Sequence, residues 1–239
     1  MHSSACTSYS CQVAPEKLSR ESVVERAIDL IDAEGLEAVT VRRLAQLLGV
    51  TPMALYWHFK NKDELLAGVA DHLLAQILAE VTDEPAWHVQ VRGVVERLVA
   101  LLDRHPALAT LLHTVDKHRV DSFNVATNMA LDLLRRGGFT VQEGFLVSSY
   151  LLSGVIGLVG GAPVCPTPLS PAEAREWRRR KRLELENLSA ERFPLLMEFA
   201  KTWEDETDVA AYYRYGVDLL MAGVETMAAR ARRTEPPRD

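Results

Sequence analysis

The sequence predicts an all-α protein, in which a three-helix helix-turn-helix unit precedes a larger helical domain. From Ser19 onward, apolar residues recur at intervals of three and four, which is the period of an amphipathic helix. Residues that favour helix ends divide this pattern into segments of ordinary helix length. Because no long stretch alternates with a period of two, no β-sheet is expected.

Four helices are expected within the first 80 residues. The predicted helix starts are Ser19, Thr40, Thr51 and Asn61, and the first two helices are predicted to end at Gly35 and Gly49. Ser, Thr and Asn side chains accept hydrogen bonds from free N–H groups of a first turn, and glycine suits the position after a last turn. Glu64 follows Asn61 by three residues, so a capping box is expected there.

Seven more helices are expected after residue 80, and the segment 160–171 is expected to be a loop. The helices are placed near 85–104, 106–114, 120–136, 140–160, 171–187, 190–203 and 208–231. A disordered arm, a helix-turn-helix domain, a helical ligand-binding and dimerisation domain and a tail are expected at 1–18, 19–66, 67–232 and 233–239. The arm is Ser-rich and aperiodic, so it lacks the apolar pattern of a packed segment.

The composition is that of an ordinary soluble globular protein. The chain has 239 residues, of which 48% are hydrophobic and 25% are charged. Three cysteines, an odd number, indicate reduced thiols, and with no secretory signal or clear membrane span in view we expect a cytoplasmic protein that does not bind a membrane.

Catalytic and metal-binding patterns are weak throughout the chain. His113 and His118, with Asp116 between them, are the clustered metal-ligand candidates, and their spacing suits one helix face poorly. No nucleophile stands in a recognisable pattern with a base, and no phosphate-binding loop is found. We therefore expect no metal, no cofactor and no enzymatic activity.

Positive charge is concentrated in one short segment. Residues 40–62 contain Arg42, Arg43, Lys60 and Lys62 and no acidic residue, so this segment carries +4. Because the whole chain carries −6, the remainder carries −10. A small basic region on an acidic protein indicates a focused anion-binding site.

The basic segment also contains an unusual row of rings, Tyr56, Trp57, His58 and Phe59. Four consecutive residues point all around a helix, so at least one ring must face solvent or a partner. A helix that ends at Gly49 and another that starts at Thr51 form a helix-turn-helix. Since a major groove about 12 Å wide accepts such a helix, double-stranded DNA is the predicted partner.

The segment 40–66, TVRRLAQLLGVTPMALYWHFKNKDELL, resembles the DNA-binding signature of the tetracycline-repressor (TetR/AcrR) family. The matching positions are Thr40, Leu44, Ala45, Gly49, Val50, Thr51, Leu55, Tyr56, His58, Phe59, Lys62, Glu64 and Leu65. A second segment, 137–157, is similar to the helix-eight segment of the ligand domain in that family.

The resemblance implies a set of DNA contacts. The residues are Thr40, Arg42, Arg43, Thr51, Met53, Tyr56, Trp57, His58 and Lys62. Hydroxyl and phenol groups would fix the register on phosphates, and Lys62 would add salt-sensitive affinity. Pro52 and Ala54 stand where tetracycline repressors have polar side chains that read bases, so a different operator is expected. The chelating positions of those repressors are not clearly kept, which argues against a magnesium–tetracycline inducer.

The resemblance also implies a homodimer with a ligand pocket. Helices 140–160 and 208–231 would pair with their mates through Gly144, Ser148, Gly154, Tyr212, Gly216, Leu219, Gly223 and Met227, although spacing alone allows both helices to be monomer core. The expected pocket residues are Leu78, His113, Met129, Ser149 and Ser153. Few charges fall in these stretches, so the ligand should be apolar or amphipathic.

The function expected from these features is that of a homodimeric repressor, released from a palindromic operator by a small-molecule effector. A DNA-binding protein without an effector, or an activator that works through a protein partner, is the alternative. The basic run REWRRRKR, residues 175–182, is flanked by acidic residues and is interpreted as a solvated helix face rather than as a second nucleic-acid contact.

Overall fold

A computed structural model describes residues 18–79, 86–163, 169–204 and 208–234. These residues form eleven α-helices and three 3₁₀ helices, without a strand, so the predicted all-α fold is confirmed. The predicted arm (apart from Leu18), the three cysteines and residues 164–168 of the predicted loop lie outside the described residues, as do positions 235–239 of the predicted tail.

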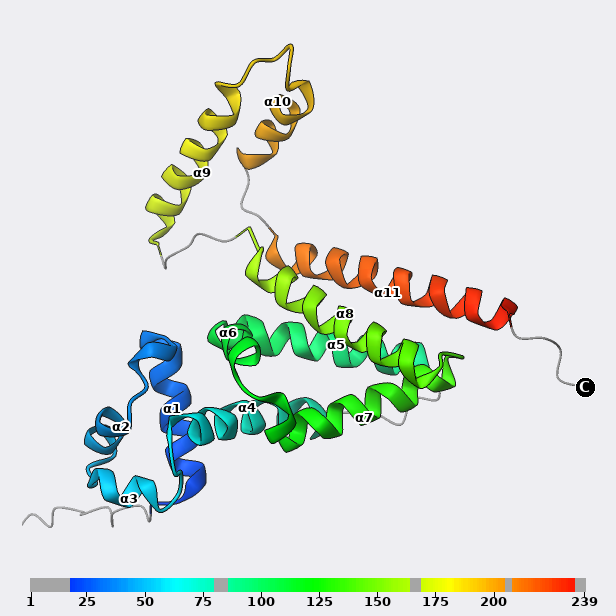
Figure 1. The fold of residues 1–239 in the computed structure, drawn as a ribbon. Helices are drawn as coiled ribbons and strands as arrows, with labels where there is room; N and C mark the ends of the chain where they lie inside the picture. Colours follow the sequence, from blue (N-terminus) through cyan, green and yellow to red (C-terminus); the bar gives the residue numbers. More distant parts are fainter. Residues whose placement is uncertain (1–17, 80–85, 164–168, 205–207, 235–239) are drawn as a thin grey trace, which may run out of the picture.

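The N-terminal unit is formed by three helices that pack around the first half of a fourth, at the blue and cyan end of Figure 1. Its elements are α1 (Arg20–Glu34), the 3₁₀ helix η1 (Leu36–Ala38), α2 (Val41–Leu48), α3 (Pro52–Tyr56) and α4 (Lys62–Ala79). Leu44, Leu55 and Phe59 are buried between them, so each of the short helices contributes to the core.

The larger domain surrounds the second half of α4. Its elements are α5 (Trp87–Arg104), α6 (Ala107–Thr114), the 3₁₀ helix η2 (Lys117–Arg119), α7 (Asp121–Arg136), α8 (Val141–Gly160) and α11 (Val209–Thr234). α5 contacts α7, α8 and α11, and α4 packs on α7. Leu102, Leu134, Val155 and Met221 are fully buried there, and they join the core of the N-terminal unit in one continuous apolar cluster.

A helical hairpin projects away from the larger domain (Figure 1). It consists of α9 (Pro171–Glu186), α10 (Pro194–Ala200) and the 3₁₀ helix η3 (Lys201–Glu204). The single helix expected over 190–203 is thus wrong in its bounds: the helix begins at Pro194, whose fixed φ suits a first turn, and it tightens into η3. No residue of α9 is buried.

The basic run of α9 is balanced within its own helix. Arg179 pairs with Glu176 at 2.8 Å, and Lys181 pairs with Glu184 at 2.8 Å. Such pairs at intervals of three or four residues are typical of a solvated helix surface. This arrangement agrees with the interpretation of 175–182 as a solvated face.

Helix caps explain most of the observed helix starts. The hydroxyl of Thr140 accepts the Glu143 N–H at 3.2 Å while the Glu143 carboxylate accepts the Thr140 N–H at 2.8 Å, which is a complete capping box. At α4, Asn61 accepts the Glu64 N–H at 2.8 Å, but the Glu64 carboxylate accepts the N–H of Lys60 instead of Asn61. The predicted capping box is therefore shifted by one residue.

α8 is, among the described residues, the one helix long and apolar enough by length and composition to cross a membrane. In this structure it packs against α5, α7 and α11, and Val147 and Val155 lie in the core. Packing on three helices accounts for part of its apolar character, and an exposed apolar face described below accounts for another part.

Candidate DNA-binding surface and ligand cavity

The turn between α2 and α3 has the geometry of a helix-turn-helix. Gly49 has a φ of +66°, in the left-handed region that glycine adopts without strain. The Val50 N–H then donates to the Ala45 carbonyl at 2.9 Å, which closes the end of α2. Thr51 starts α3, and its hydroxyl accepts the Ala54 N–H at 3.3 Å. These local bonds fix the angle at which α3 leaves the turn.

The row of rings is divided between the core and the surface. Phe59 is buried, and His58 is half-buried. Tyr56 is 47% exposed and Trp57 is 86% exposed, and Met53 on α3 is 68% exposed. Large side chains with this exposure cost solvation free energy unless a partner covers them. α3 therefore presents a ringed surface to an external partner.

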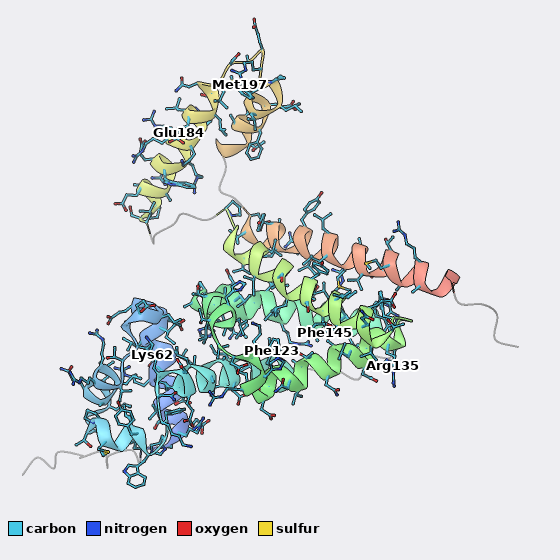
Figure 2. The ribbon with its side chains drawn as sticks, viewed as in Figure 1. Lys62, Phe123, Arg135, Phe145, Glu184 and Met197 are labelled. Carbon is cyan, nitrogen blue, oxygen red and sulfur yellow. The ribbon has the colours of Figure 1, made fainter. Side chains whose placement is uncertain are left out.

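The two arginines of α2 differ in their partners. Both guanidinium groups are exposed, and that of Arg43 forms an ion pair with Glu34 of α1. Arg42 has no ion pair with any described residue, so its charge is available to a phosphate or base. Lys62, at the start of α4, is half-buried and likewise lacks an ion pair among the described residues. Figure 2 places Lys62 in the N-terminal unit, away from Phe123 and Phe145 of the larger domain.

One arginine that the sequence analysis did not single out holds the end of this surface in place. The Arg20 guanidinium donates to the His58 carbonyl at 2.8 Å and lies 4.2 Å from the centre of the Phe59 ring. It also donates to the Glu64 carboxylate at 3.3 Å. The hydrogen bond from the Lys60 N–H, with a smaller contribution from Arg20, lowers the pKa of Glu64, so this carboxylate stays ionised at neutral pH.

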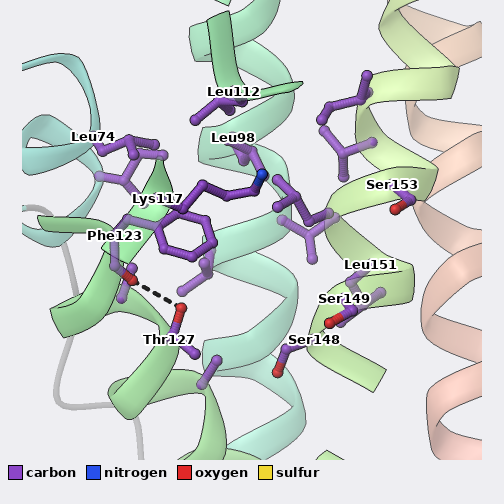
Figure 3. Close-up of a pocket in the computed structure, with 18 of the residues that line it drawn as sticks. Leu74, Leu98, Leu112, Lys117, Phe123, Thr127, Ser148, Ser149, Leu151 and Ser153 are labelled. Carbon is purple, nitrogen blue, oxygen red and sulfur yellow. Dashed lines mark hydrogen bonds between the residues drawn. The ribbon is translucent and has the colours of Figure 1, made fainter. Parts of the chain in front are cut away.

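A cavity of about 550 Å³ lies in the larger domain, between α4, α5, α6, η2, α7 and α8 (Figure 3). Most of its lining is apolar and includes Leu74, Leu98, Leu112, Phe123 and Leu151. The polar lining residues are His113, Asp116, Lys117, His118, Thr127, Ser148, Ser149 and Ser153. An apolar cavity with a few polar groups is typical of a small-molecule site.

Three of the five predicted pocket residues line this cavity, namely His113, Ser149 and Ser153. Leu78 and Met129 do not line it, and the neighbouring residues Ile77 and Ala130 do. The cavity is thus lined by helices that the sequence analysis associated with a pocket, but partly by other residues of those helices. Although His113, Asp116 and His118 all line the cavity, no group of three potential metal ligands is found in the described part of the chain.

Two polar contacts join the N-terminal unit to the walls of the cavity. Nδ1 of His105, just before α6, lies 2.8 Å from the Asp32 carboxylate of α1. The N–H of Ser122, in the first turn of α7, donates to the Asp71 carboxylate of α4 at 2.7 Å. α6 and α7 both line the cavity, so a change in the position of either helix would reach α1 or α4 through these contacts.

The predicted dimer residues fall into two groups. Several make contacts within their own chain: Gly144 is buried against α7, and Ser148 donates to the Gly144 carbonyl at 2.8 Å. Where α8 and α11 cross, a Cβ at Gly154 would meet Leu220, and one at Gly216 would meet Leu158. Tyr212 donates to the Gly161 carbonyl at 3.2 Å. Gly154 and Gly216 therefore serve the crossing of these two helices. The other predicted residues, Leu219, Gly223 and Met227, are exposed on α11.

An apolar face runs along α8 and α11 on the outside of this crossing. We call it the α8–α11 face, and it consists of Leu146, Tyr150, Tyr215, Leu219, Gly223 and Met227. Tyr150 is 74% exposed and Tyr215 is 69% exposed. The sequence analysis did not name the two tyrosines or Leu146. A signal was available, because Leu146 and Tyr150 are four residues apart, as are Tyr215 and Leu219.

Comparison with known proteins identifies the family. The family model described as "Bacterial regulatory proteins, tetR family" matches residues 23–69, which contain the helix-turn-helix. The tetracycline repressor protein class C of Escherichia coli is 30% identical over 217 residues, which cover 88% of this chain and 92% of that protein. The HTH-type transcriptional repressor DrrR1 of Streptomyces coeruleorubidus is 27% identical over 236 residues, covering 92% of this chain and 82% of that protein.

A solved structure agrees over nearly the whole chain. The TetR family protein ActR of Streptomyces coelicolor, in complex with actinorhodin, superposes with a TM-score of 0.74 at 26% identity, covering 90% of this chain and 99% of ActR. These relatives are regulators of transcription and not enzymes. The chain therefore belongs to the tetR family of bacterial regulatory proteins, and it is a DNA-binding transcriptional regulator.

Proposed function

We propose that the chain acts as a homodimeric repressor, which leaves a palindromic operator in the cytoplasm when a small apolar or amphipathic effector enters the cavity. The observation that carries the proposal is the course of α4. This helix begins at Lys62, beside the DNA-binding surface, and its Leu74 and Ile77 line the cavity. One continuous helix thus connects the two sites.

An effector can act only through its different affinity for two arrangements of the molecule. In the DNA-bound arrangement the two α3 helices of a dimer must match successive major grooves, about 34–36 Å apart or a multiple of that. An effector that prefers another position of α4, α6 or α7 would alter this separation. The contacts of His105 with Asp32 and of Ser122 with Asp71 support such coupling.

The α8–α11 face supports the dimeric state. It combines exposed leucines with two exposed tyrosines and a methionine, and aromatic residues and methionine are enriched at protein interfaces. A homodimer that buries this face has two-fold symmetry, and a palindromic operator matches that symmetry. Two relatives are named repressors, which favours repression by this chain too. The structure of ActR contains bound actinorhodin, which favours a small-molecule effector.

Selection of bound DNA from a random pool tests the proposal. The expected result is a palindromic consensus, bound with an affinity that falls steeply as salt rises because each phosphate contact releases counterions. A titration of the selected operator with amphipathic compounds then tests release.

Two outcomes would contradict the proposal in different ways. A consensus without two-fold symmetry would exclude binding as a symmetric homodimer. A compound that occupies the cavity and leaves operator affinity unchanged would favour the alternative, a regulator that acts without an effector or through a protein partner.

A further inference from the structure

Lys117 of η2 lies among the apolar walls of the cavity. Figure 3 shows its side chain extending over the Phe123 ring toward Leu98, with the amino group directed into the interior. The residue is half-buried. Around it stand apolar side chains from four helices, of which Leu74, Leu98 and Leu112 are labelled in the same view.

The ammonium group of Lys117 has no ion pair and no side-chain hydrogen bond with any residue that the structure describes. Asp116, the one acidic residue of the lining, instead accepts the His118 N–H at 3.2 Å. Arg92 on α5, by contrast with Lys117, forms an ion pair, with Asp218 at 2.6 Å. The Lys117 ammonium therefore has no ion-pair partner among the described residues, although the Asp116 carboxylate also lines the cavity.

A cation beside apolar walls loses hydration that only a negative charge or several acceptors can replace. The hydroxyl of Thr127 donates to the Phe123 carbonyl at 2.8 Å and accepts no hydrogen bond from Lys117 in the described structure. A neutral apolar ligand that fills the cavity would cover the Lys117 ammonium without compensating it. An anionic ligand would form a charge-assisted contact with the same group.

We propose that the effector is an aromatic or otherwise apolar organic acid whose carboxylate, or similar anionic group, pairs with Lys117. Its apolar body occupies the space between Phe123, Leu98 and Leu112. Ser149 and Ser153, across the cavity on α8, are available to hydrogen-bond a polar group at the other end. The role of this ligand as an effector rests on the proposed function, but its binding site can be tested without DNA.

The test uses a matched pair of fluorescent probes on the full chain. Anilinonaphthalene sulfonate is an aromatic anion, and phenylnaphthylamine is its neutral parent. Replacing Lys117→Met keeps an apolar stem of similar length and removes the charge. We expect the variant to bind the sulfonate roughly tenfold to a hundredfold more weakly, as for loss of a charge-assisted contact, and to bind phenylnaphthylamine as tightly as before or more tightly.

The matched control is Lys201→Met, which removes the same charge from an exposed position outside the cavity. It should leave both affinities unchanged. Equal affinity of the sulfonate for the unaltered chain and for Lys117→Met would overturn the proposal. Should Lys117→Met lose both probes, Lys117→Arg and Lys117→Gln decide: preferential sulfonate binding by the Arg variant supports the anion site, and equal binding by both refutes it.

Operator release is measured separately. Lys117-dependent binding of the sulfonate without any change in operator affinity would leave the anion site standing and would refute the effector role in the proposed function. If the sulfonate and phenylnaphthylamine bind the cavity equally well and both release the operator, the anion site alone would be refuted.

Discussion

At the scale of single residues, the two arginines of α2 show how a neighbour decides function. Arg42 and Arg43 are adjacent, exposed and chemically identical, so the sequence cannot rank them. Arg43 is held by Glu34 of α1, a residue nine positions earlier that the fold brings beside it. Arg42 has no such partner among the described residues. The difference appears only once α1 and α2 are packed.

We predict that Arg42→Ala weakens operator binding more than Arg43→Ala. Arg42 brings a free charge to DNA, whereas Arg43 must first give up part of its contact with Glu34. Loss of one phosphate contact should reduce the slope of log affinity against log salt by about 1. Fluorescence anisotropy of a labelled operator over a salt series measures both quantities. A larger loss in Arg43→Ala would show that the Glu34 pair does not persist on DNA.

At the scale of elements, a half-buried phenol is one of the contacts between α5 and α11. Tyr213 of α11 donates to the Asp103 carboxylate of α5 at 2.8 Å. Burial, reinforced by this hydrogen bond, raises the pKa of Tyr213 to about 12 from an ordinary value of 10.0. The folded state therefore holds the phenol proton more tightly than the unfolded state does.

A raised folded-state pKa stabilises the fold fully below the unfolded pKa and loses that contribution as pH rises toward the folded pKa. Tyr213→Phe should thus lower the free energy of unfolding by about 1 kcal/mol at neutral pH. The gap between the two proteins should narrow between about pH 10 and 12. Urea unfolding at several pH values measures it, with Tyr56→Phe, an exposed position outside the α8–α11 face, as the control. A gap that stays constant to pH 12 would contradict the assignment.

Elements also show where sequence reasoning succeeds and where it stops. The helix starts at Thr40, Thr51 and Thr140 were predictable because a cap involves residues only three apart. The choice between Ile77 and Leu78 was not, since both are apolar and the packing of α4 on α7 decides which faces the cavity. Gly154 stays a predicted dimer residue: small residues allow a close helix crossing, but they do not say whether the second helix is from the same chain, and within this chain Gly154 faces Leu220.

At the scale of the whole molecule, the α8–α11 face and the α9–α10 hairpin are rival surfaces for assembly. Both expose large apolar side chains, including Leu219 at 60% on α11 and Leu195 at 77% on α10. The α8–α11 face belongs to helices that are anchored in the core by Val155 and Met221. The hairpin has few buried residues of its own, so it is the less rigid base for a stable dimer.

We predict that Leu219→Asp converts a dimer into a monomer, because it places a charge in the centre of the buried face. Its affinity for a palindromic operator should fall by roughly two orders of magnitude or more, since each half-site is then bound separately. Leu195→Asp, the same change at a more exposed leucine, should remain dimeric. Light scattering measures the mass of each protein. A monomeric Leu195→Asp beside a dimeric Leu219→Asp would move the interface to the hairpin.

The path of α4 has a consequence for dissecting this regulator. Gly68 of α4 lies against Phe59 and Val24, two residues past the predicted end of the helix-turn-helix domain at residue 66, and Leu73 continues the same apolar cluster. Cutting the chain at Leu66 would therefore remove part of the hydrophobic core of the helix-turn-helix unit. Because one apolar cluster joins the DNA-binding unit and the larger domain through α4, we expect a hybrid regulator to need the whole of α4 from one parent.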